Sequence, residues 1–392
     1  MKLKILTLIL AAVTAISAAA KLKVGAERPE LYLPLLEGKR VALLSNHTGL
    51  VGSDREHTLD FLLRNGVKVT TIFSPEHGFR GTADAGAHVS SSVDAKTGIP
   101  IASLYNGKGS SMPAPEVMDR FDVIVTDLQD VGVRFYTYYI TMLRLMNAAQ
   151  ASGKEFIVFD RPNPIGMMVD GPVLDMKLKS GVGALPIPVA HGMTLGELAQ
   201  MICGEGWLNG KNELKLTVIP CAGYTHSTRY ILPVHPSPNL KSMHAIYLYP
   251  STCYFEGTAA SLGRGTDSPF EIYGHPNMKP TGFTFTPRSM SGAKNPPLKG
   301  LECNGKDLRV IPDSEIIDNG VDLSYIIDAY HNTKLPTGKK FFTPFFDKLI
   351  GDSRIRPMIE QGKSAAEIKA LWADDVKNFI KKRKPYLLYH EQ

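Results

Sequence analysis

Short apolar runs rich in β-branched residues alternate with segments of helical periodicity along the first half of the chain. We expect strands at residues 40–44, 67–73, 99–104, 121–126 and 155–159. Helices are expected at residues 54–65, 138–151 and 194–203, the first capped by Asp54 and the last beginning with a capping box of Thr194 and Glu197. Such alternation indicates crossover connections, and it predicts an α/β fold: a Rossmann-like, mostly parallel sheet with helices on both faces.

The pattern changes after about residue 224, where prolines, glycines and aromatic residues follow one another closely. We expect loops and short strands there, with the domain boundary at 225–245. Further along, the chain predicts a strand at 308–311 and helices at 323–331 and 365–381. The expected organisation is a signal peptide at 1–20, a Rossmann-like catalytic domain at 21–240, and a smaller α+β C-terminal domain at 241–392 that contributes to the cleft.

The first 20 residues have the features of a secretory signal peptide: a basic start, an apolar stretch, and small residues before a cleavage site near Ala20. The apolar stretch Ile5–Ile16 is too short to span the roughly 30 Å hydrocarbon core of a bilayer, which disfavours an uncleaved anchor. The rest of the chain has no other apolar run of about 18 residues. We therefore expect an exported protein, periplasmic or secreted, without a membrane span.

The composition is that of a globular protein. The chain is 43% hydrophobic and 21% charged, and its net charge is only +6 over 392 residues. Because no long run of like charges is present, nucleic-acid or membrane-surface binding is not indicated. The four cysteines lack C-x-x-C spacing, which disfavours a zinc cluster and leaves their pairing open.

Polar and charged residues directly follow four of the expected strands. The segments are Ser45–Gly49, Ser74–Gly81, Asp127–Tyr138 and Asp160–Pro164. In an open parallel sheet, ligands bind in the crevice beyond the carboxyl ends of the strands, so these segments are expected to meet there. A helix cap or a loop salt bridge would explain any one of them, but four together favour a shared site.

The sequence lacks several common catalytic and cofactor motifs. There is no G-x-S-x-G elbow, no G-x-G-x-x-G loop after the first strand, and no H-E-x-x-H helix. His47, His77 and His191 are scattered, and their spacing does not indicate a metal site, so we expect neither a metal nor a cofactor. The remaining carboxylates, arginines and aromatic residues suit a sugar-binding site, because carboxylates supply acid–base catalysis and arginines bind anionic substituents.

Four motifs at these positions carry a resemblance to a known family. They are SPEHGFRG (Ser74–Gly81), DLQDVGVRFYTY (Asp127–Tyr138), DRPNP (Asp160–Pro164) and EGTAASLGRGTDSPFEIYGHP (Glu256–Pro276). Together they resemble the exo-acting β-N-acetylmuramidases, a family of peptidoglycan glycoside hydrolases, from about Arg40 to Tyr389. The resemblance implies a Rossmann-like N-terminal domain, a smaller C-terminal domain and an active cleft between them. It also implies release of N-acetylmuramic acid (MurNAc) from the non-reducing ends of peptidoglycan-derived sugars of the MurNAc-GlcNAc type.

Glu76 is the first candidate for the catalytic acid. Glycoside hydrolysis usually takes two carboxyl groups, one of which holds a proton near neutral pH. Glu76 follows a buried strand directly, and burial in the cleft would raise its pKa in the direction that an acid catalyst needs. The alternative is a structural glutamate that caps the loop or pairs with Arg80.

The sequence leaves several candidates for the second catalytic group. Asp130 ranks ahead of Asp127 and Asp160, since Asp127 lies closest to its strand and would cap the loop. A tyrosine nucleophile, Tyr136 or Tyr138, is the alternative, because some glycosidases use one. Retention or inversion depends on the separation of the carboxyl groups, about 5–5.5 Å against 6.5–9.5 Å.

The substrate-binding set follows from the chemistry of N-acetylmuramic acid, whose lactyl carboxylate requires a fixed cation. Arg80, Arg134 and Arg264 are the candidates for that cation, and a loop-bracing role is the alternative for each. The expected substrate-binding residues are His77, Arg80, Asn46, Asp127, Arg134, Tyr136, Tyr138, Asp160, Asn163, His191, Glu256 and Arg264.

Two other functions are consistent with the same residues. A periplasmic sugar- or muropeptide-binding protein without catalysis would keep the arginines and aromatic residues but would not need Glu76. A cell-wall amidase or esterase would use a metal or a pair such as Ser45 and His47. Turnover of a chromogenic β-N-acetylmuraminide distinguishes the hydrolase from both.

Overall fold

The structure, a computed structural model, describes residues 21–76, 78–79, 92–104 and 112–391. At its centre is a seven-stranded sheet with the strand order β11-β8-β7-β1-β4-β6-β5. The strands are β1 (Arg40–Ser45), β4 (Lys68–Ser74), β5 (Ser92–Val93), β6 (Pro100–Ser103), β7 (Val123–Asp127), β8 (Glu155–Phe159) and β11 (Leu216–Ile219). All neighbouring pairs are parallel except β5 and β6, which confirms the mostly parallel sheet.

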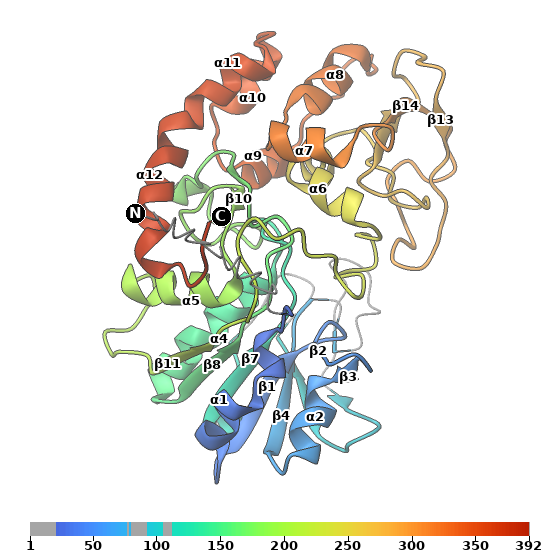
Figure 1. Ribbon diagram of the computed structural model, residues 1–392. Coiled ribbons are helices and arrows are strands. Elements are labelled where there is room, and N and C mark those ends of the chain that lie inside the picture. Colours follow the sequence, from blue (N-terminus) through green and yellow to red (C-terminus); the bar gives the residue numbers. More distant parts are fainter. Residues whose placement is uncertain (1–20, 77, 80–91, 105–111, 392) are drawn as a thin grey trace, which may run out of the picture.

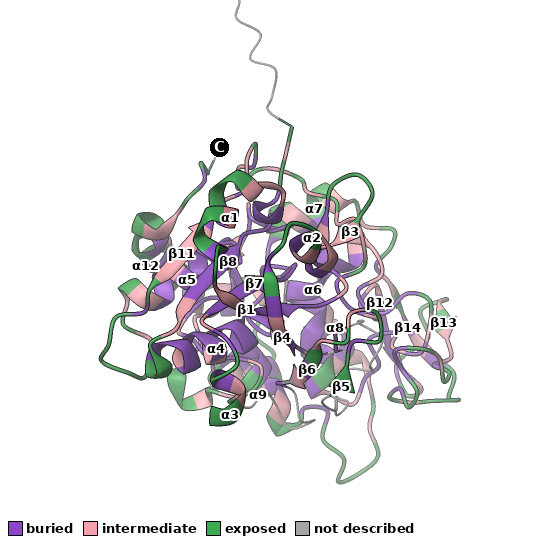
Figure 2. Ribbon diagram, turned by 90° about the horizontal axis from the view of Figure 1, so that it is seen from below, coloured by how far each residue is buried: buried purple, intermediate pink, exposed green. Residues whose placement is uncertain are grey.

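Helices cover both faces of the sheet, as the alternation along β1 requires. Val41 and Leu43 pack in one apolar cluster with residues of α1 (Pro29–Leu36) and α2 (Thr58–Arg64). Ala42 and Leu44 point to the other face, into a cluster with α4 (Tyr138–Ser152) and α5 (Leu195–Gly204). Successive side chains of a strand point to opposite faces, so a strand that is apolar throughout is buried on both. Figure 2 shows the resulting buried interior around β1, β7 and α4.

The helix expected at residues 54–65 is shorter than predicted. It begins at Thr58, because β2 (Leu50–Val51) and β3 (Glu56–His57) pair as an antiparallel hairpin whose turn contains Asp54. His57 therefore replaces Asp54 as the N-cap, and its Nδ1 accepts a hydrogen bond from the backbone N–H of Leu59. The capping box predicted for α5 is confirmed, with Thr194 and Glu197 bonded reciprocally.

The chain after residue 224 contains more helix than its prolines suggest. The segment Met243–Thr252 is a helix, α6, with Pro250 inside it. A three-stranded antiparallel sheet follows it, with β14 (Cys303–Asp307) between β12 (Ile272–His275) and β13 (Thr284–Phe285). The strand predicted at 308–311 is wrong: β14 ends at Asp307, and the next residues form a turn closed by a hydrogen bond from the N–H of Ile311 to the carbonyl of Leu308.

The remaining elements complete the second half and its connections. They are α3 (Pro115–Met118), β9 (Val169–Asp170), β10 (Ala190–His191), β12 (Ile272–His275), β13 (Thr284–Phe285), β14 (Cys303–Asp307), α7 (Asp313–Asn319), α8 (Ser324–Asn332), α9 (Pro344–Ile350), α10 (Ile355–Glu360), α11 (Ala365–Lys369) and α12 (Ala373–Arg383). The helix predicted at 365–381 is thus divided into α11 and α12 by a 3₁₀ turn at Ala370–Trp372. The helix predicted at 323–331 is confirmed as α8.

The C-terminal helices and the sheet share one apolar core. The cluster that contains α4 and α5 continues through Phe346 of α9 to Trp372. The chain then returns to the N-terminal half, where Tyr389 donates a hydrogen bond to Asp160 over 2.6 Å. Figure 1 shows the sheet in the lower half and the orange and red helices above it, with long loops between them.

The described part of the chain contains neither a membrane-spanning helix nor a disulfide. Within the described ranges, no helix is both long and apolar enough to cross a bilayer. The four cysteines, all of which are described, are free thiols. The predicted signal peptide lies outside the described residues.

Candidate active site

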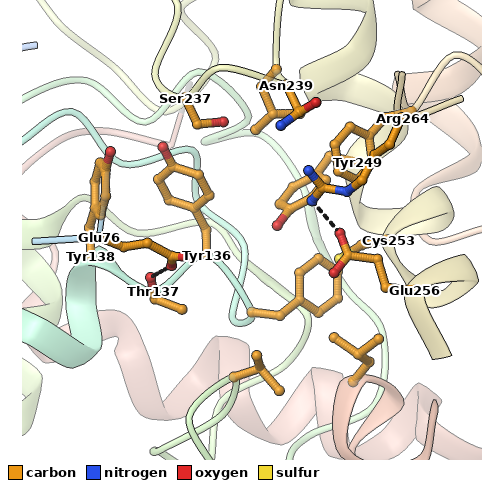
Figure 3. A pocket seen from close by; sticks show the side chains of 15 residues that line it. Glu76, Tyr136, Thr137, Tyr138, Ser237, Asn239, Tyr249, Cys253, Glu256 and Arg264 are labelled. Atoms are coloured by element: carbon orange, nitrogen blue, oxygen red, sulfur yellow. Dashed lines mark hydrogen bonds and ion pairs between the residues drawn. The ribbon is translucent and has the colours of Figure 1, made fainter. Parts of the chain in front are cut away.

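A pocket lies beyond the carboxyl ends of β4 and β7, where the N-terminal half meets the C-terminal half (Figure 3). Glu76 and the segment from Phe135 to Tyr138 come from the N-terminal half, and Glu256 and Arg264 come from the C-terminal half. The other lining residues are Val182, Ser237, Asn239, Leu240, Tyr249, Cys253, Phe270 and Leu349. Two of the four strand-end segments that the sequence predicts to share a site, those after β4 and β7, therefore meet in this pocket, and the other two do not line it.

The carboxylate of Glu76 is held in place by the start of α4. Thr137 is the N-cap residue of α4, but its side chain makes no capping hydrogen bond. Instead, its hydroxyl donates to Oε2 of Glu76 over 2.7 Å. Glu76 is half-buried, two residues after the end of β4, so a rigid strand and a helix terminus together set the position of this carboxyl group.

Two tyrosines form one wall of the pocket. Tyr136 and Tyr138 both donate their hydroxyl hydrogens to the carbonyl of Pro236, over 2.8 and 2.9 Å, and their ring centroids lie 4.6 Å apart. Burial raises the pKa of both phenols above the usual range, which keeps them protonated. A neutral phenol that already donates to a carbonyl is a poor nucleophile, so the geometry argues against the tyrosine alternative.

Asn46 supports this wall from behind. Its Nδ2 donates to the hydroxyl of Tyr138 over 2.8 Å, and its Oδ1 accepts from the hydroxyl and the N–H of Thr48. Asn46 is fully buried and does not line the pocket described here. It therefore positions a pocket residue rather than contacting a ligand there.

The opposite wall carries an ion pair. Nη2 of Arg264 lies 2.6 Å from Oε1 of Glu256, and the guanidinium lies 5.1 Å from the centroid of the Phe270 ring. Gly263 and Gly265 flank Arg264 with φ angles of 83° and 82°, a conformation that favours glycine. The carboxylate and the ring together fix the position and the plane of the guanidinium.

Two of the aspartates at strand ends, Asp127 and Asp160, have structural roles. The buried Asp127 forms a bidentate pair with Arg161, with Nε–Oδ1 and Nη2–Oδ2 distances of 2.5 and 3.0 Å. Asp160 accepts hydrogen bonds from Thr194, from the N–H of Gly196 at the start of α5, and from Tyr389. Neither lines the pocket, because their oxygens are bonded to the interior.

Asn163 and His191, both expected to bind substrate, are also interior residues. Nδ2 of Asn163 donates to the carbonyl of Met193, and its Oδ1 accepts from the N–H of Ile165, each over 2.9 Å. Nδ1 of His191 accepts from the N–H of Met193, and burial lowers the pKa of this histidine to about 3. A neutral histidine held by the backbone in this way stabilises a loop.

Arg134, a candidate for the lactyl carboxylate, is bonded to backbone carbonyls instead. Its guanidinium is buried and donates to Pro172, Ile187, Leu349 and Ile350 over 2.6 to 3.1 Å. These acceptors belong to loops of the N-terminal half and to the end of α9. The structure therefore favours the bracing role that the sequence left as the alternative.

Asp130, the preferred second catalytic residue, is buried and does not line this pocket. Its Oδ1 accepts from the N–H of Gly132 over 2.7 Å, and its Oδ2 has no hydrogen-bond partner in the described part of the chain. Burial raises the pKa of Asp130 to about 7. The loop after β7 thus turns Asp130 into the protein and presents Tyr136 and Thr137 to the pocket.

Replacing Asp130 with asparagine is expected to stabilise the protein at alkaline pH. The folded state binds the Asp130 proton more tightly than the unfolded state, so stability is lost as pH rises from about 4 through about 7. The asparagine side chain would keep the acceptor for Gly132 without the buried charge, and we expect the gain at pH 8 to exceed the gain at pH 5 by roughly 2–3 kcal/mol. Urea unfolding at both pH values measures the difference. Loss of activity in a stable Asp130→Asn variant would instead return Asp130 to the catalytic set.

Several pocket residues were not singled out from the sequence. Thr137 lies inside a motif segment but carries no chemistry of its own, and Asn239 directly follows Pro238 in a loop. Tyr249 belongs to α6, whose periodicity Pro250 obscures. His77 and Arg80 lie outside the described residues. Across the residues that the structure describes, no group of three or more His, Cys, Asp or Glu side chains is arranged to hold a metal ion.

Comparison with known proteins assigns the chain to a class of glycoside hydrolases, and a pocket with two glutamates and aromatic walls at the strand ends is consistent with that class. The family models for the N-terminal and C-terminal parts of exo-β-N-acetylmuramidase NamZ match residues 41–244 and 247–389. The chain belongs to this family, which confirms the resemblance seen in the four motifs.

Individual relatives support the same assignment. The chain is 38% identical over 376 residues to the peptidoglycan β-N-acetylmuramidase NamZ of Bacillus subtilis, an alignment that covers 91% of this chain and 89% of the relative. A crystal structure of a DUF1343 family protein from Bacteroides fragilis has a TM-score of 0.87 and 54% identity, covering 95% of this chain and 100% of that chain. A second DUF1343 protein from the same organism has a TM-score of 0.78 and 28% identity, with coverage of 94% and 99%.

Proposed function

We propose that this chain hydrolyses the β-glycosidic bond of terminal N-acetylmuramic acid at the non-reducing ends of peptidoglycan fragments of the MurNAc-GlcNAc type, with Glu76 as the proton donor. The observation that carries the proposal is the placement of the Glu76 carboxyl group. It lies in the pocket, bonded to Thr137, across from the Glu256–Arg264 pair (Figure 3). The family assignment supports the reaction, and the geometry supports the residue.

The acid step requires a proton on Glu76. Transfer of this proton to the glycosidic oxygen breaks the bond to the anomeric carbon and releases the rest of the glycan as an alcohol. The hydroxyl of Thr137 donates to Oε2 of Glu76 and so fixes the orientation of the carboxyl group. The tyrosine wall fits stacking against the sugar ring, because Tyr136 and Tyr138 are held rigidly by Pro236.

Glu256 replaces Asp130 as the candidate for the second carboxyl group. Apart from Glu76, it is the carboxylate that lines the described pocket, and Arg264 holds it as half of an ion pair. An ionised carboxylate at this place would stabilise the positive charge that develops at the anomeric carbon or activate the attacking water.

Arg264 is the candidate cation for the lactyl carboxylate of the terminal sugar. We expect Arg264→Met to lower kcat/KM for a chromogenic β-N-acetylmuraminide by about 30- to 1,000-fold, since a charge-assisted contact in a partly dry pocket is lost. The corresponding β-N-acetylglucosaminide lacks the lactyl group, so the variant should discriminate less between the two substrates. Steady-state kinetics on both substrates measure this change.

Arg309 offers a matched control, because it forms a comparable but more exposed pair with Asp307. Arg309→Met should leave both rates unchanged, as exposed ion pairs contribute little. An equal loss on both chromogenic substrates in Arg264→Met would contradict lactyl recognition by Arg264.

Turnover separates the proposed hydrolase from a binding protein. Purified protein incubated with MurNAc-GlcNAc is expected to release free N-acetylmuramic acid, detectable by chromatography. Binding of the disaccharide without its cleavage would contradict the proposal.

Export is proposed as well, on the basis of the first 20 residues. The mature protein from the producing cells should begin after Ala20, which N-terminal sequencing would show.

A further inference from the structure

A second, larger hollow adjoins the pocket that contains Glu76. Ser237 lines both, and the second hollow has a volume of about 620 Å³ against about 100 Å³ for the first. Saccharide-sized ligands usually occupy pockets of about 300–1,000 Å³. The smaller pocket therefore accommodates only part of a glycan, and among the described residues the larger hollow is an adjoining space of sufficient size.

The larger hollow is basic. Lys241, His47 and His235 line it, together with Pro233, Val234, Ser237, Pro238, Met290 and Ser291, and these lining residues include no carboxylate. The ammonium group of Lys241 contacts the carbonyl of Thr266 at 3.5 Å, and it forms no ion pair with any residue that the structure describes. A cation that is not paired with a carboxylate attracts an anionic ligand.

The walls of the two spaces are tied together. Lys241 directly follows Leu240, which lines the smaller pocket, and its contact Thr266 lies two residues after Arg264. Asn239 donates a hydrogen bond to the carbonyl of Gly292 over 2.8 Å, which anchors the turn at Met290–Ala293 to the same segment. A ligand that spans both spaces would therefore meet a pre-formed surface, so little ordering cost is added on binding.

We propose that this basic hollow binds the leaving-group side of the substrate through a carboxylate, with Lys241 as the principal cation. The inference rests on the proposed function, because an exo-acting enzyme with the terminal sugar at Glu76 must accept the rest of the glycan outside that pocket. In peptidoglycan this remainder carries carboxylates on the lactyl group of the next muramyl residue or on its stem peptide. Prolines and Met290 supply the apolar surface against which sugar C–H groups pack.

The test compares substrates with and without an anionic leaving group in a Lys241→Met variant. For the tetrasaccharide MurNAc-GlcNAc-MurNAc-GlcNAc, we expect KM to rise about two- to fivefold at low ionic strength with kcat unchanged, the size of effect that one partly exposed charge pair produces. The KM for a chromogenic β-N-acetylmuraminide, whose leaving group has no carboxylate, should stay the same. High salt should remove the difference between the parent and the variant, because it screens an exposed pair.

A tetrasaccharide with a stem peptide on the second muramyl residue identifies the carboxylate. The peptide converts the lactyl acid into an amide and moves the negative charge outward. If Lys241→Met raises KM only for the tetrasaccharide without the peptide, Lys241 binds the lactyl carboxylate. If it raises KM only for the tetrasaccharide with the peptide, Lys241 binds a carboxylate of the peptide. Lys211→Met, which removes an exposed lysine outside both spaces, is the matched control and should not alter any KM.

Two outcomes would overturn the inference. An unchanged KM for both tetrasaccharides would show that Lys241 does not contact the leaving group. An equal rise in KM for the chromogenic substrate would show that Lys241 serves the terminal sugar instead. Failure of the parent protein to cleave the chromogenic substrate is a different result, since it contradicts the proposed function rather than the basic hollow.

Discussion

Glu76→Gln is expected to reduce kcat for MurNAc-GlcNAc by about 10²- to 10⁴-fold, the usual contribution of a positioned general acid. Glutamine keeps the size of the side chain and an oxygen that accepts the hydrogen bond from Thr137, so the pocket should retain its shape. It has no acidic proton, however, and the leaving sugar would have to depart as an alkoxide.

The choice of leaving group makes this test specific. A nitrophenyl leaving group departs without protonation, so the chromogenic substrate should lose far less rate than the disaccharide. The alkaline limb of the pH–rate profile, which reports the acid, should also disappear. Steady-state kinetics on both substrates over a range of pH values measure these effects.

Glu302 provides the control for this substitution, because it is exposed and lies outside both pockets. Glu302→Gln should match the parent in rate and in melting temperature. A folded Glu76→Gln variant that cleaves the disaccharide at the parental rate would remove Glu76 from the mechanism. Equal losses on both substrates would also argue against acid catalysis, since they would indicate a general disturbance of the site.

Arg134→Met is expected to lower the free energy of unfolding by about 3–5 kcal/mol, because several buried carbonyls lose their donors at once. The four acceptors lie on separate segments, so one side chain joins loops of the N-terminal half to the end of α9. Gly351 marks how closely they pack: its φ is 79°, and a Cβ there would lie 2.5 Å from Nη2 of Arg134. Urea unfolding measures the loss.

Two further variants, Arg134→Lys and Arg120→Met, test whether the lost hydrogen bonds of Arg134 cause the loss of stability. Lysine cannot reproduce the planar set of five donors, so Arg134→Lys should recover only a small part of the stability. Arg120→Met, at an exposed arginine, should change little. The folded fraction of Arg134→Met should bind substrate with the parental KM. Normal stability combined with a raised KM for muramyl substrates would show that Arg134 contacts the substrate after all.

The elements predicted well are those with long, regular patterns. The strands β1, β4, β7 and β8 are buried on both faces, and their apolar runs are visible in the sequence. The helices α4 and α5 are also long enough to show their period. The helices α7, α9 and α10 have only seven, seven and six residues, so no repeat develops, and packing against the shared core decides their structure.

The candidate site was predictable only in part. The rule that parallel strands present their carboxyl ends to one crevice found Glu76, Tyr136 and Tyr138, all of which line the pocket. The same rule also selected Asp127 and Asp160, which occupy equivalent positions in the sequence. Their partners Arg161 and Tyr389 turn them inward, and Tyr389 lies 229 residues from Asp160.

By itself, the sequence determined the parallel α/β architecture, the strand ends that carry the chemistry, and, through four motifs, the family. Only the tertiary structure decided which polar side chains face the pocket, that Arg134 braces the fold, and that Lys241 lines a second hollow beside Glu76. The physical reason is the range of the interactions. Periodicity records how each short segment meets the core, whereas the direction of a polar side chain depends on partners from distant segments that only folding brings together.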